Sequence, residues 1–356
     1  MEAPAPRLTS LDALRGLDML IILGIDALVY ALYPLSGGGA AATFIREQMG
    51  HAPWEGLRMY DCVFPLFVFM AGISMCFSQL RRYDIPIGRN LIKLWKRALV
   101  LVLLGMLVNG NISCDLSQMR CASVLGLIGL SGALAGSATL LISHRILPNF
   151  IFAALLLTGV GIAQHLGGDM TPGGCFNAKV DAALCPGVLH SGSYDPEGPL
   201  CIISGTALCL LGYCGGRLFL QINSAGLRVI TMLGSGLLLL AGGWWLPCIK
   251  GIWTPGFVLC SAGISSVLMS IFHLFIDVFR LGKWVLPLSV VGMNALAIYV
   301  LTHIVSFQAL AARALGGTWS LLISPEWQKM AHAVVALLLA WWLCWFLHRK
   351  RVYIKI

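Results

Sequence analysis

The residues best suited to chemistry lie just before the second long apolar run of the chain. They are His51, Trp54, Glu55 and Asp61. Residues 63–77 follow without a charge and predict a helix that enters hydrocarbon. A histidine at the mouth of such a helix can act as acid, base or nucleophile, because an unperturbed imidazole titrates near neutral pH. The alternative is an interfacial histidine beside an aromatic anchor, an arrangement common at membrane boundaries.

The composition is typical of a membrane protein. The chain has 356 residues, of which 58% are hydrophobic and 11% are charged, far from the balance of a soluble domain. The formal net charge is +9, but the basic residues stand at the ends of apolar segments, where membrane topology requires them. We therefore expect an all-α, polytopic integral membrane protein whose partners include membrane lipid and exclude nucleic acid.

Apolar runs predict about ten transmembrane helices. They cover residues 17–34, 60–80, 91–109, 121–142, 148–166, 200–220, 228–246, 256–277, 286–305 and 329–347. If the amino terminus is cytoplasmic, most Lys and Arg residues fall on the cytoplasmic side, and this bias sets the orientation. It requires an even number of spans, places both termini in the cytoplasm and puts His51 on the outer face.

We expect a single transmembrane domain over residues 1–356, with a long outer loop at residues 167–199. This loop is longer than a tight turn and is suited to be a binding lid. It contains Cys175 and Cys185, which either pair as a disulfide in an oxidising compartment or stay as free thiols. The sequence has no CxxC pair and no zinc-type Cys/His spacing, so we expect no metal site.

The first apolar helix carries four ionisable residues: Asp12, Arg15, Asp18 and Asp26. At about 100 degrees per residue, all four fall within an arc of about 120 degrees. A polar stripe in a spanning helix is costly unless it faces a cavity or a partner, and so it is a functional hypothesis. The alternative is an internal ion pair of Arg15 with Asp12 or Asp18. Asp26 lies deeper and is harder to explain by pairing near the surface.

Two later segments add polar groups. Asp195 and Glu197 flank a turn directly before the sixth span, where carboxylates can orient an amine or bind a sugar hydroxyl; the alternative is an ordinary helix start, where acids suit the dipole. In the ninth span, Asn294 and His303 fall on opposite faces of a continuous helix, so both can line one narrow cavity only if the helix is broken. His303 alone is more typical of a residue that satisfies helix packing.

Five motifs occur in the order in which they occur in a known enzyme family: residues 7–16, residues 51–56, Asp61 with Phe64-Pro65, residues 195–198 and residues 292–295. Together they resemble the heparan-α-glucosaminide N-acetyltransferase family and its bacterial relatives, over nearly the whole chain. The resemblance implies a multi-helix transmembrane acyltransferase that takes acetyl groups from cytosolic acetyl-CoA and delivers them to a terminal glucosamine across the membrane. It also implies that His51 is the catalytic residue and that the enzyme works as a homodimer.

The chain departs from the family pattern in places that concern the acceptor. Asp26 stands where the lysosomal enzyme has an asparagine, and the segment between Asp26 and His51 is longer, with glycines at residues 37–39. The lysosomal enzyme also has a lumenal domain before its first span, which we do not expect in this chain. We therefore expect an enzyme of the bacterial inner membrane, with cell-wall or scavenged amino sugars as acceptors.

The donor in this interpretation is acetyl-CoA, which is anionic and too large to cross a bilayer. Its phosphates should stay near basic side chains of the inner face, although the positive-inside rule alone also explains each of these residues. The candidates are Arg15, Arg82, Lys93 and Arg97.

The acetyl group would meet His51, which acts as general base toward the sugar amine or accepts the acetyl group as nucleophile. Asp26 or Asp61 would orient the imidazole. Asn294 would donate a hydrogen bond to the developing oxyanion. The residues expected to bind the acceptor are Trp54, Glu55, Asp195 and Glu197.

Two other functions fit the same sequence. An O-acyltransferase of polysaccharides would use the same donor and acylate a hydroxyl group. A proton-coupled transporter would use Asp18, Asp26 and His303 as a relay. Against the transporter, the two halves of the chain show no convincing internal repeat of the kind common in transporters.

Overall fold

The computed structural model describes residues 8–80, 85–111, 118–282, 285–317 and 323–354. Within these ranges the chain is helical, and its only strand-like pairing is two isolated β-bridges. The α-helices are α1 (Thr9–Leu20), α2 (Asp26–Leu35), α3 (Ala40–Gln48), α4 (Val63–Leu80), α5 (Ile87–Val108), α6 (Val124–Leu141), α7 (Ile146–Gly167), α8 (Phe176–Leu184), α9 (Pro199–Gln221), α10 (Ala225–Trp244), α11 (Pro255–Phe272), α12 (Leu286–Met293), α13 (Ala295–Ile304), α14 (Phe307–Ala314) and α16 (Pro325–Arg349). π-Helical segments at Ile21–Ile25 and His273–Val278 extend α1 and α11.

Eight helices of the described chain are long and apolar enough to cross a membrane, and there are nine spans if the bent pair α12 and α13 counts as one. The all-α, polytopic membrane architecture is therefore confirmed, but the sequence had predicted about ten spans. The difference is α5, which has 22 residues but carries Lys93, Lys96 and Arg97 in its first half. Cations in hydrocarbon are costly unless they face a cavity, so α5 is not a purely apolar span.

The first helix starts earlier than the sequence predicted and is broken in its middle. α1 begins at Thr9 rather than near residue 17, and a kink lies at Gly24. Gly24 has a φ of 148°, a backbone conformation that residues with a side chain rarely adopt. α2 begins at Asp26, after this kink. The single polar face predicted from a continuous helix is therefore wrong for Asp26.

Two glycines of the predicted motifs bring α1 and α12 into contact. A methyl group on Gly16 would overlap the carbonyl oxygen of Leu288, and one on Gly292 would overlap that of Asp12. Small residues of this kind let helix backbones approach closely inside a membrane. Both glycines therefore have a packing role.

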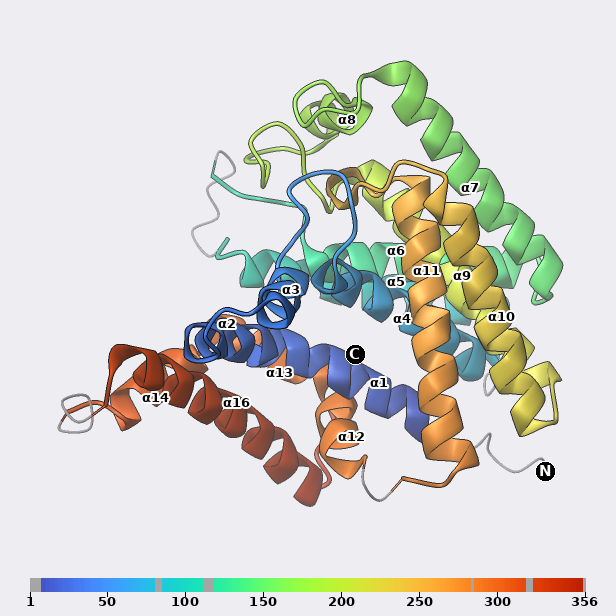
Figure 1. The fold of residues 1–356 in the computed structure, drawn as a ribbon. Helices are drawn as coiled ribbons and strands as arrows, with labels where there is room; N and C mark the ends of the chain where they lie inside the picture. The colour runs from blue at the N-terminus through green and yellow to red at the C-terminus, as the bar shows by residue number, and fades with distance from the viewer. Residues whose placement is uncertain (1–7, 81–84, 112–117, 283–284, 318–322, 355–356) are drawn as a thin grey trace.

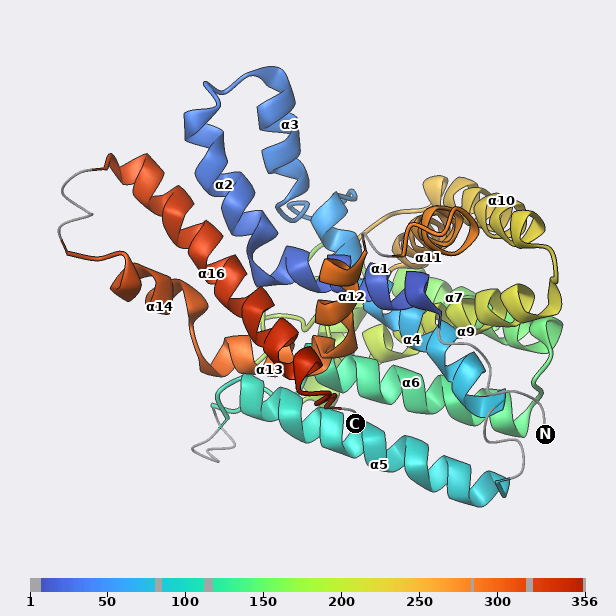
Figure 2. The same ribbon diagram turned by 90° about the horizontal axis from the view of Figure 1, so that it is seen from below.

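α4 and α9 form the centre of the molecule, and α6, α7 and α11 pack against α9. α10 lies beside α11 (Figure 1), and α5 lies along α6 (Figure 2). The helices α2, α3, α14 and α16 project to one side of this bundle (Figure 2). The connection after α3, the region around α8 and the loop between α10 and α11 gather at one end of the molecule, away from the amino terminus (Figure 1). This end holds the candidate site.

The long loop predicted at residues 167–199 contains the short helix α8. α8 lies between Cys175 and Cys185, and both thiols are free. Because α8 has 9 residues, roughly 14 Å of helix separates the two cysteines at about 1.5 Å per residue. A disulfide needs Cα atoms within about 7 Å, so the paired alternative is wrong.

Candidate active site

Two distant segments fix the stretch that carries His51. The backbone N–H of Gly56 donates to the carbonyl of Cys248 at 2.8 Å, and Glu55 pairs with Ile249 in an antiparallel bridge. The indole N–H of Trp54 donates to the carbonyl of Met170 at 2.6 Å. The loop between α10 and α11 and the loop before α8 thus hold residues 51–58 against the start of α4.

His51 and Asp61 form a hydrogen-bonded pair. Nδ1 of His51 lies 2.7 Å from Oδ1 of Asp61. The other carboxylate oxygen accepts the backbone N–H groups of Ala52 at 3.1 Å and Arg58 at 3.0 Å. The side chain of Asp61 is 1% exposed, whereas that of His51 is 55% exposed. A buried carboxylate held by backbone donors therefore orients an accessible imidazole, as in catalytic triads.

Lys250 joins this pair, and no motif in the sequence marks it as a site residue. Its Nζ lies 2.9 Å from Nδ1 of His51 and 3.3 Å from Oδ1 of Asp61. Burial lowers the pKa of Lys250, an effect that the charge of Asp61 opposes. Lys250 comes from the 3-10 turn Lys250–Ile252 between α10 and α11, so only the tertiary fold brings it to His51.

Asp26 reaches His51 indirectly. Tyr60 donates its hydroxyl to Oδ2 of Asp26 at 3.3 Å, and the rings of Tyr60 and His51 are 5.0 Å apart. The other oxygen of Asp26 accepts the backbone N–H of Ala27 at 2.7 Å. Of the two carboxylates considered for orienting His51, the structure therefore places Asp61 against the imidazole and Asp26 behind Tyr60.

Trp54 forms a wall beside the site. Its ring meets that of Tyr194 edge to face at 5.4 Å, and a methyl group on Gly251 would press against both rings. Trp54 is half-buried, and Glu55 is exposed. An aromatic wall next to an exposed carboxylate is a surface that can receive a polar ligand such as a sugar.

Asp195 and Glu197 are buried and contact Arg120. Asp195 is fully buried and accepts two hydrogen bonds from Arg120, at 2.8 and 2.7 Å. It also accepts the backbone N–H groups of His190 at 3.1 Å and Glu197 at 3.0 Å. Both oxygens of Asp195 therefore have internal donors, and these hydrogen bonds support the loop.

Glu197 completes the same cluster with a contact to Arg120. Burial raises the pKa of Glu197 to about 7, and the neighbouring charge of Asp195 adds to this effect while Arg120 opposes it. The negative charge of Glu197 also acts on Lys250. Glu197 therefore links the buried Arg120 cluster to the His51 site electrostatically.

Asn294 lies at the break between α12 and α13, which are bent by 70°. Its amide group donates to the carbonyl of Val352 at 3.2 Å and accepts the backbone N–H of Ile354 at 3.1 Å. These contacts tie Asn294 to the carboxyl-terminal segment. The continuous ninth helix predicted from the sequence is wrong. His303 is exposed, and its Nδ1 lies 2.8 Å from the carbonyl of Tyr299.

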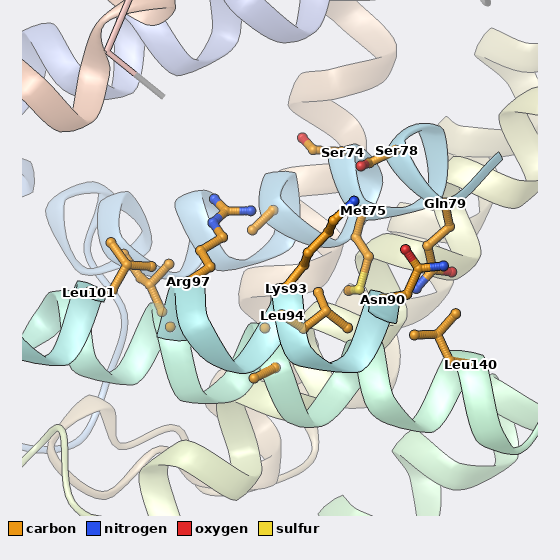
Figure 3. Close-up of a pocket in the computed structure, with 15 residues that line it drawn as sticks. Ser74, Met75, Ser78, Gln79, Asn90, Lys93, Leu94, Arg97, Leu101 and Leu140 are labelled. Carbon is orange, nitrogen blue, oxygen red and sulfur yellow. The ribbon is translucent and has the colours of Figure 1, made fainter. Parts of the chain in front are cut away.

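Two adjoining cavities of about 350 and 360 Å³ lie beside α4 and α5. Arg97 lines both cavities, Lys93 lines the first and Arg15 lines the second. Figure 3 shows Lys93 and Arg97 reaching from α5 toward Ser74 and Ser78 on α4. Three of the four residues expected to hold the donor phosphates are thus brought together, and the fourth, Arg82, lies outside the described residues.

Arg15 has a local partner as well as a place in this cavity. It pairs with Asp12 at 3.5 Å and donates to the hydroxyl of Ser74 on α4. The ion pair considered for the first helix is therefore present. Asp18, in contrast, is buried, and neither of its oxygens has a hydrogen-bond partner among the residues that the structure describes.

The second cavity is lined by basic and aromatic side chains, among them Arg15, Phe64 and Tyr299. Phe64 packs edge to face on Trp253 at 5.3 Å. It follows Asp61 by three residues, or roughly 4.5 Å along a helix axis. The basic side chains of this cavity can hold an anionic ligand, and Phe64 in its lining lies close in sequence to Asp61.

Comparison with known proteins agrees with the motifs. No protein-family model matches the chain. The chain is similar to human heparan-alpha-glucosaminide N-acetyltransferase, with 22% identity over 84% of this chain and 53% of the human protein. The resemblance predicted from the motifs is confirmed. The chain spans about half the length of the human protein that it matches.

Proposed function

We propose that this integral membrane protein is an N-acetyltransferase that moves an acetyl group from cytosolic acetyl-CoA to an amine across the bilayer. The acceptor in this proposal is a terminal glucosamine or a related amino sugar, and the membrane is a bacterial inner membrane. The similarity to an enzyme named for N-acetyl transfer supports the chemistry. The basic residues of the cavities support the donor.

Two observations carry the proposal: the hydrogen-bonded His51–Asp61 pair, and a basic cavity whose lining includes Phe64, three residues after Asp61. Arg15, Lys93 and Arg97 line the cavities and suit the phosphates of coenzyme A, because charge-assisted hydrogen bonds to phosphate are strong. The thioester would then point toward Phe64, close to the pair. A long donor held in this way presents its acetyl carbon to the imidazole.

In the direct route, the sugar amine attacks the acetyl carbon while Nε2 of His51 takes one proton from the amine. The C–N bond forms, the C–S bond breaks, and the imidazolium returns its proton to the leaving thiolate. In the covalent route, Nε2 attacks first, the C–S bond breaks and coenzyme A leaves as its thiolate; the amine then attacks the acetyl carbon, the C–Nε2 bond breaks, and the proton that the amine loses balances the thiolate. In both routes Asp61 holds Nδ1–H, so that Nε2 presents its lone pair.

The test uses the purified protein in detergent with acetyl-CoA, with and without glucosamine, and measures the free thiol of coenzyme A. His51→Ala should abolish glucosamine-dependent release and leave acetyl-CoA binding unchanged. The matched control is His165→Ala, which removes an exposed histidine of α7 and should release thiol at the wild-type rate. Glucosamine-dependent release in His51→Ala would contradict the proposal.

The acceptor is tested in the same assay with glucosamine, glucose and N-acetylglucosamine. Stimulation by glucosamine alone supports transfer to an amine. Equal stimulation by the two sugars that lack a free amine identifies an O-acyltransferase. Burst release with an acetylated His51 peptide, detected by mass spectrometry, selects the covalent route over the direct one.

A further inference from the structure

Lys250 lies within contact distance of a second group that can carry a positive charge. Nδ1 of His51 is 2.9 Å from Nζ of Lys250, and both face Oδ1 of Asp61, at 2.7 and 3.3 Å respectively. Two cations in contact repel, so that charging one disfavours charging the other. A single carboxylate oxygen therefore stabilises one positive charge at this site better than two.

We propose that Lys250 is a positioning residue that holds the positive charge beside Asp61 and thereby keeps the imidazole of His51 neutral. The form that takes a proton or an acetyl group at Nε2 is a neutral imidazole with its proton on Nδ1. This tautomer requires Nδ1–H and the ammonium of Lys250 both to donate to Oδ1 of Asp61 rather than the ammonium to Nδ1. This inference rests on the proposed acetyl transfer and adds the residue that sets the protonation state of its catalytic histidine.

The charge resides on Lys250 because an amine is the stronger base, by about four pH units for the free side chains. The groups that face Lys250 are His51, Asp61, Glu197 and Cys62. Two of these are acids, and their negative charges oppose the lowering of the Lys250 pKa by burial. The side chain of Lys250 is also less exposed than that of His51, at 24% and 55%. Water therefore screens the attraction between Asp61 and the ammonium less than it screens the attraction between Asp61 and a charged imidazole.

The loop that carries Lys250 is held rigidly. Thr254 accepts the backbone N–H of Ile249 at 3.0 Å and donates its hydroxyl to the carbonyl of Pro247 at 2.7 Å. Trp253 is buried in a left-handed backbone conformation with a φ of 46°, which for a bulky residue is maintained only by surrounding structure. These contacts fix the ammonium where it meets the imidazole.

The test measures the protonation of His51 without relying on transfer. Diethyl pyrocarbonate modifies neutral imidazole, and mass spectrometry of the His51 peptide gives its extent of modification at each pH. In Lys250→Met and Lys250→Gln, the midpoint of this pH profile should move to higher pH, because a neighbouring cation is removed and Asp61 remains. Lys250→Arg keeps the charge and should keep the wild-type midpoint. His165 in the same samples serves as the internal control.

The rate of thiol release from acetyl-CoA, measured against pH, should also change in Lys250→Met and Lys250→Gln. The rise of this rate on the acidic side of the profile should move to higher pH. An unchanged His51 midpoint in both neutral variants would overturn the role of Lys250, and a role in folding alone would leave the midpoint where it is. If the midpoint moves but no variant and no wild-type sample transfers acetyl groups, the proposed function fails and the charge arrangement stands. The glutamine variant keeps a hydrogen-bonding group toward Asp61, so the test holds if the methionine variant does not fold.

Discussion

Asp61→Asn separates the role of the carboxylate charge from its shape. Oδ2 of Asp61 accepts the backbone N–H groups of Ala52 and Arg58, so the oxygen of an asparagine must take that place. Its NH2 group then replaces Oδ1, where it faces Nδ1 of His51 and Nζ of Lys250. Because an NH2 group only donates, Nδ1 of His51 must become an acceptor. The proton then sits on Nε2, and the ring cannot act as base or nucleophile.

The expected loss in kcat is about three to four orders of magnitude, the size that follows when a catalytic histidine is held in the wrong tautomer. Lys250 also loses its carboxylate partner, which should lower the free energy of unfolding by about 1 to 3 kcal/mol. Thiol release and thermal unfolding in detergent measure the two effects separately. Acetyl-CoA binding should remain at the wild-type level.

The matched control is Asp277→Asn. His273 and Asp277 form another histidine–aspartate pair, with Nδ1 and Oδ2 at 2.9 Å, on the π-helical extension of α11. Removing this carboxylate should leave kcat unchanged. A folded Asp61→Asn protein with more than about a tenth of the wild-type kcat would refute the assignment of Asp61. A histidine held in the wrong tautomer should lower kcat by far more than tenfold.

Three further changes test other parts of the structure. Arg97→Gln should weaken acetyl-CoA binding about tenfold, the loss of one charge-assisted contact, while Lys96→Gln, a cation outside both cavities, should bind normally in isothermal titration. Because the pKa of Glu197 is raised to about 7, wild-type stability should be complete below pH 4.5 and fall by roughly 2 to 3 kcal/mol as pH rises through 7; thermal unfolding of Glu197→Gln should lack this fall. Gly292→Ala should cost about 1 to 3 kcal/mol through overpacking, whereas Gly159→Ala, which meets open space, should melt like wild type.

The predicted class and the spans followed from composition and apolar runs, and most helices lie where those runs are. The errors fall where a local signal competes with tertiary packing. The break at Gly24 and the bend at Asn294 were missed, because an apolar run has the same periodicity whether the helix is straight or broken. α5 was counted as a span because its apolar second half outweighed the cations of its first half.

The site could be predicted only in part. His51 and Asp61 stand close in sequence before an apolar run, and the structure joins them at 2.7 Å. The role of Asp195 and Glu197 at the acceptor stays a prediction, and the structure adds that both are buried and bonded to Arg120. A carboxylate at a helix start has the same sequence pattern whether it is buried or exposed.

The sequence by itself determined that the chain enters a membrane, that a histidine stands at a helix mouth and that basic residues gather at the ends of apolar runs, because hydrophobicity and charge are properties of the residues themselves. Only the tertiary structure decided which groups meet. Lys250 is far from His51 along the chain, and its approach depends on the bridge between Glu55 and Ile249. The protonation of a histidine depends on charges within a few ångströms, and such distances follow from packing rather than from sequence order.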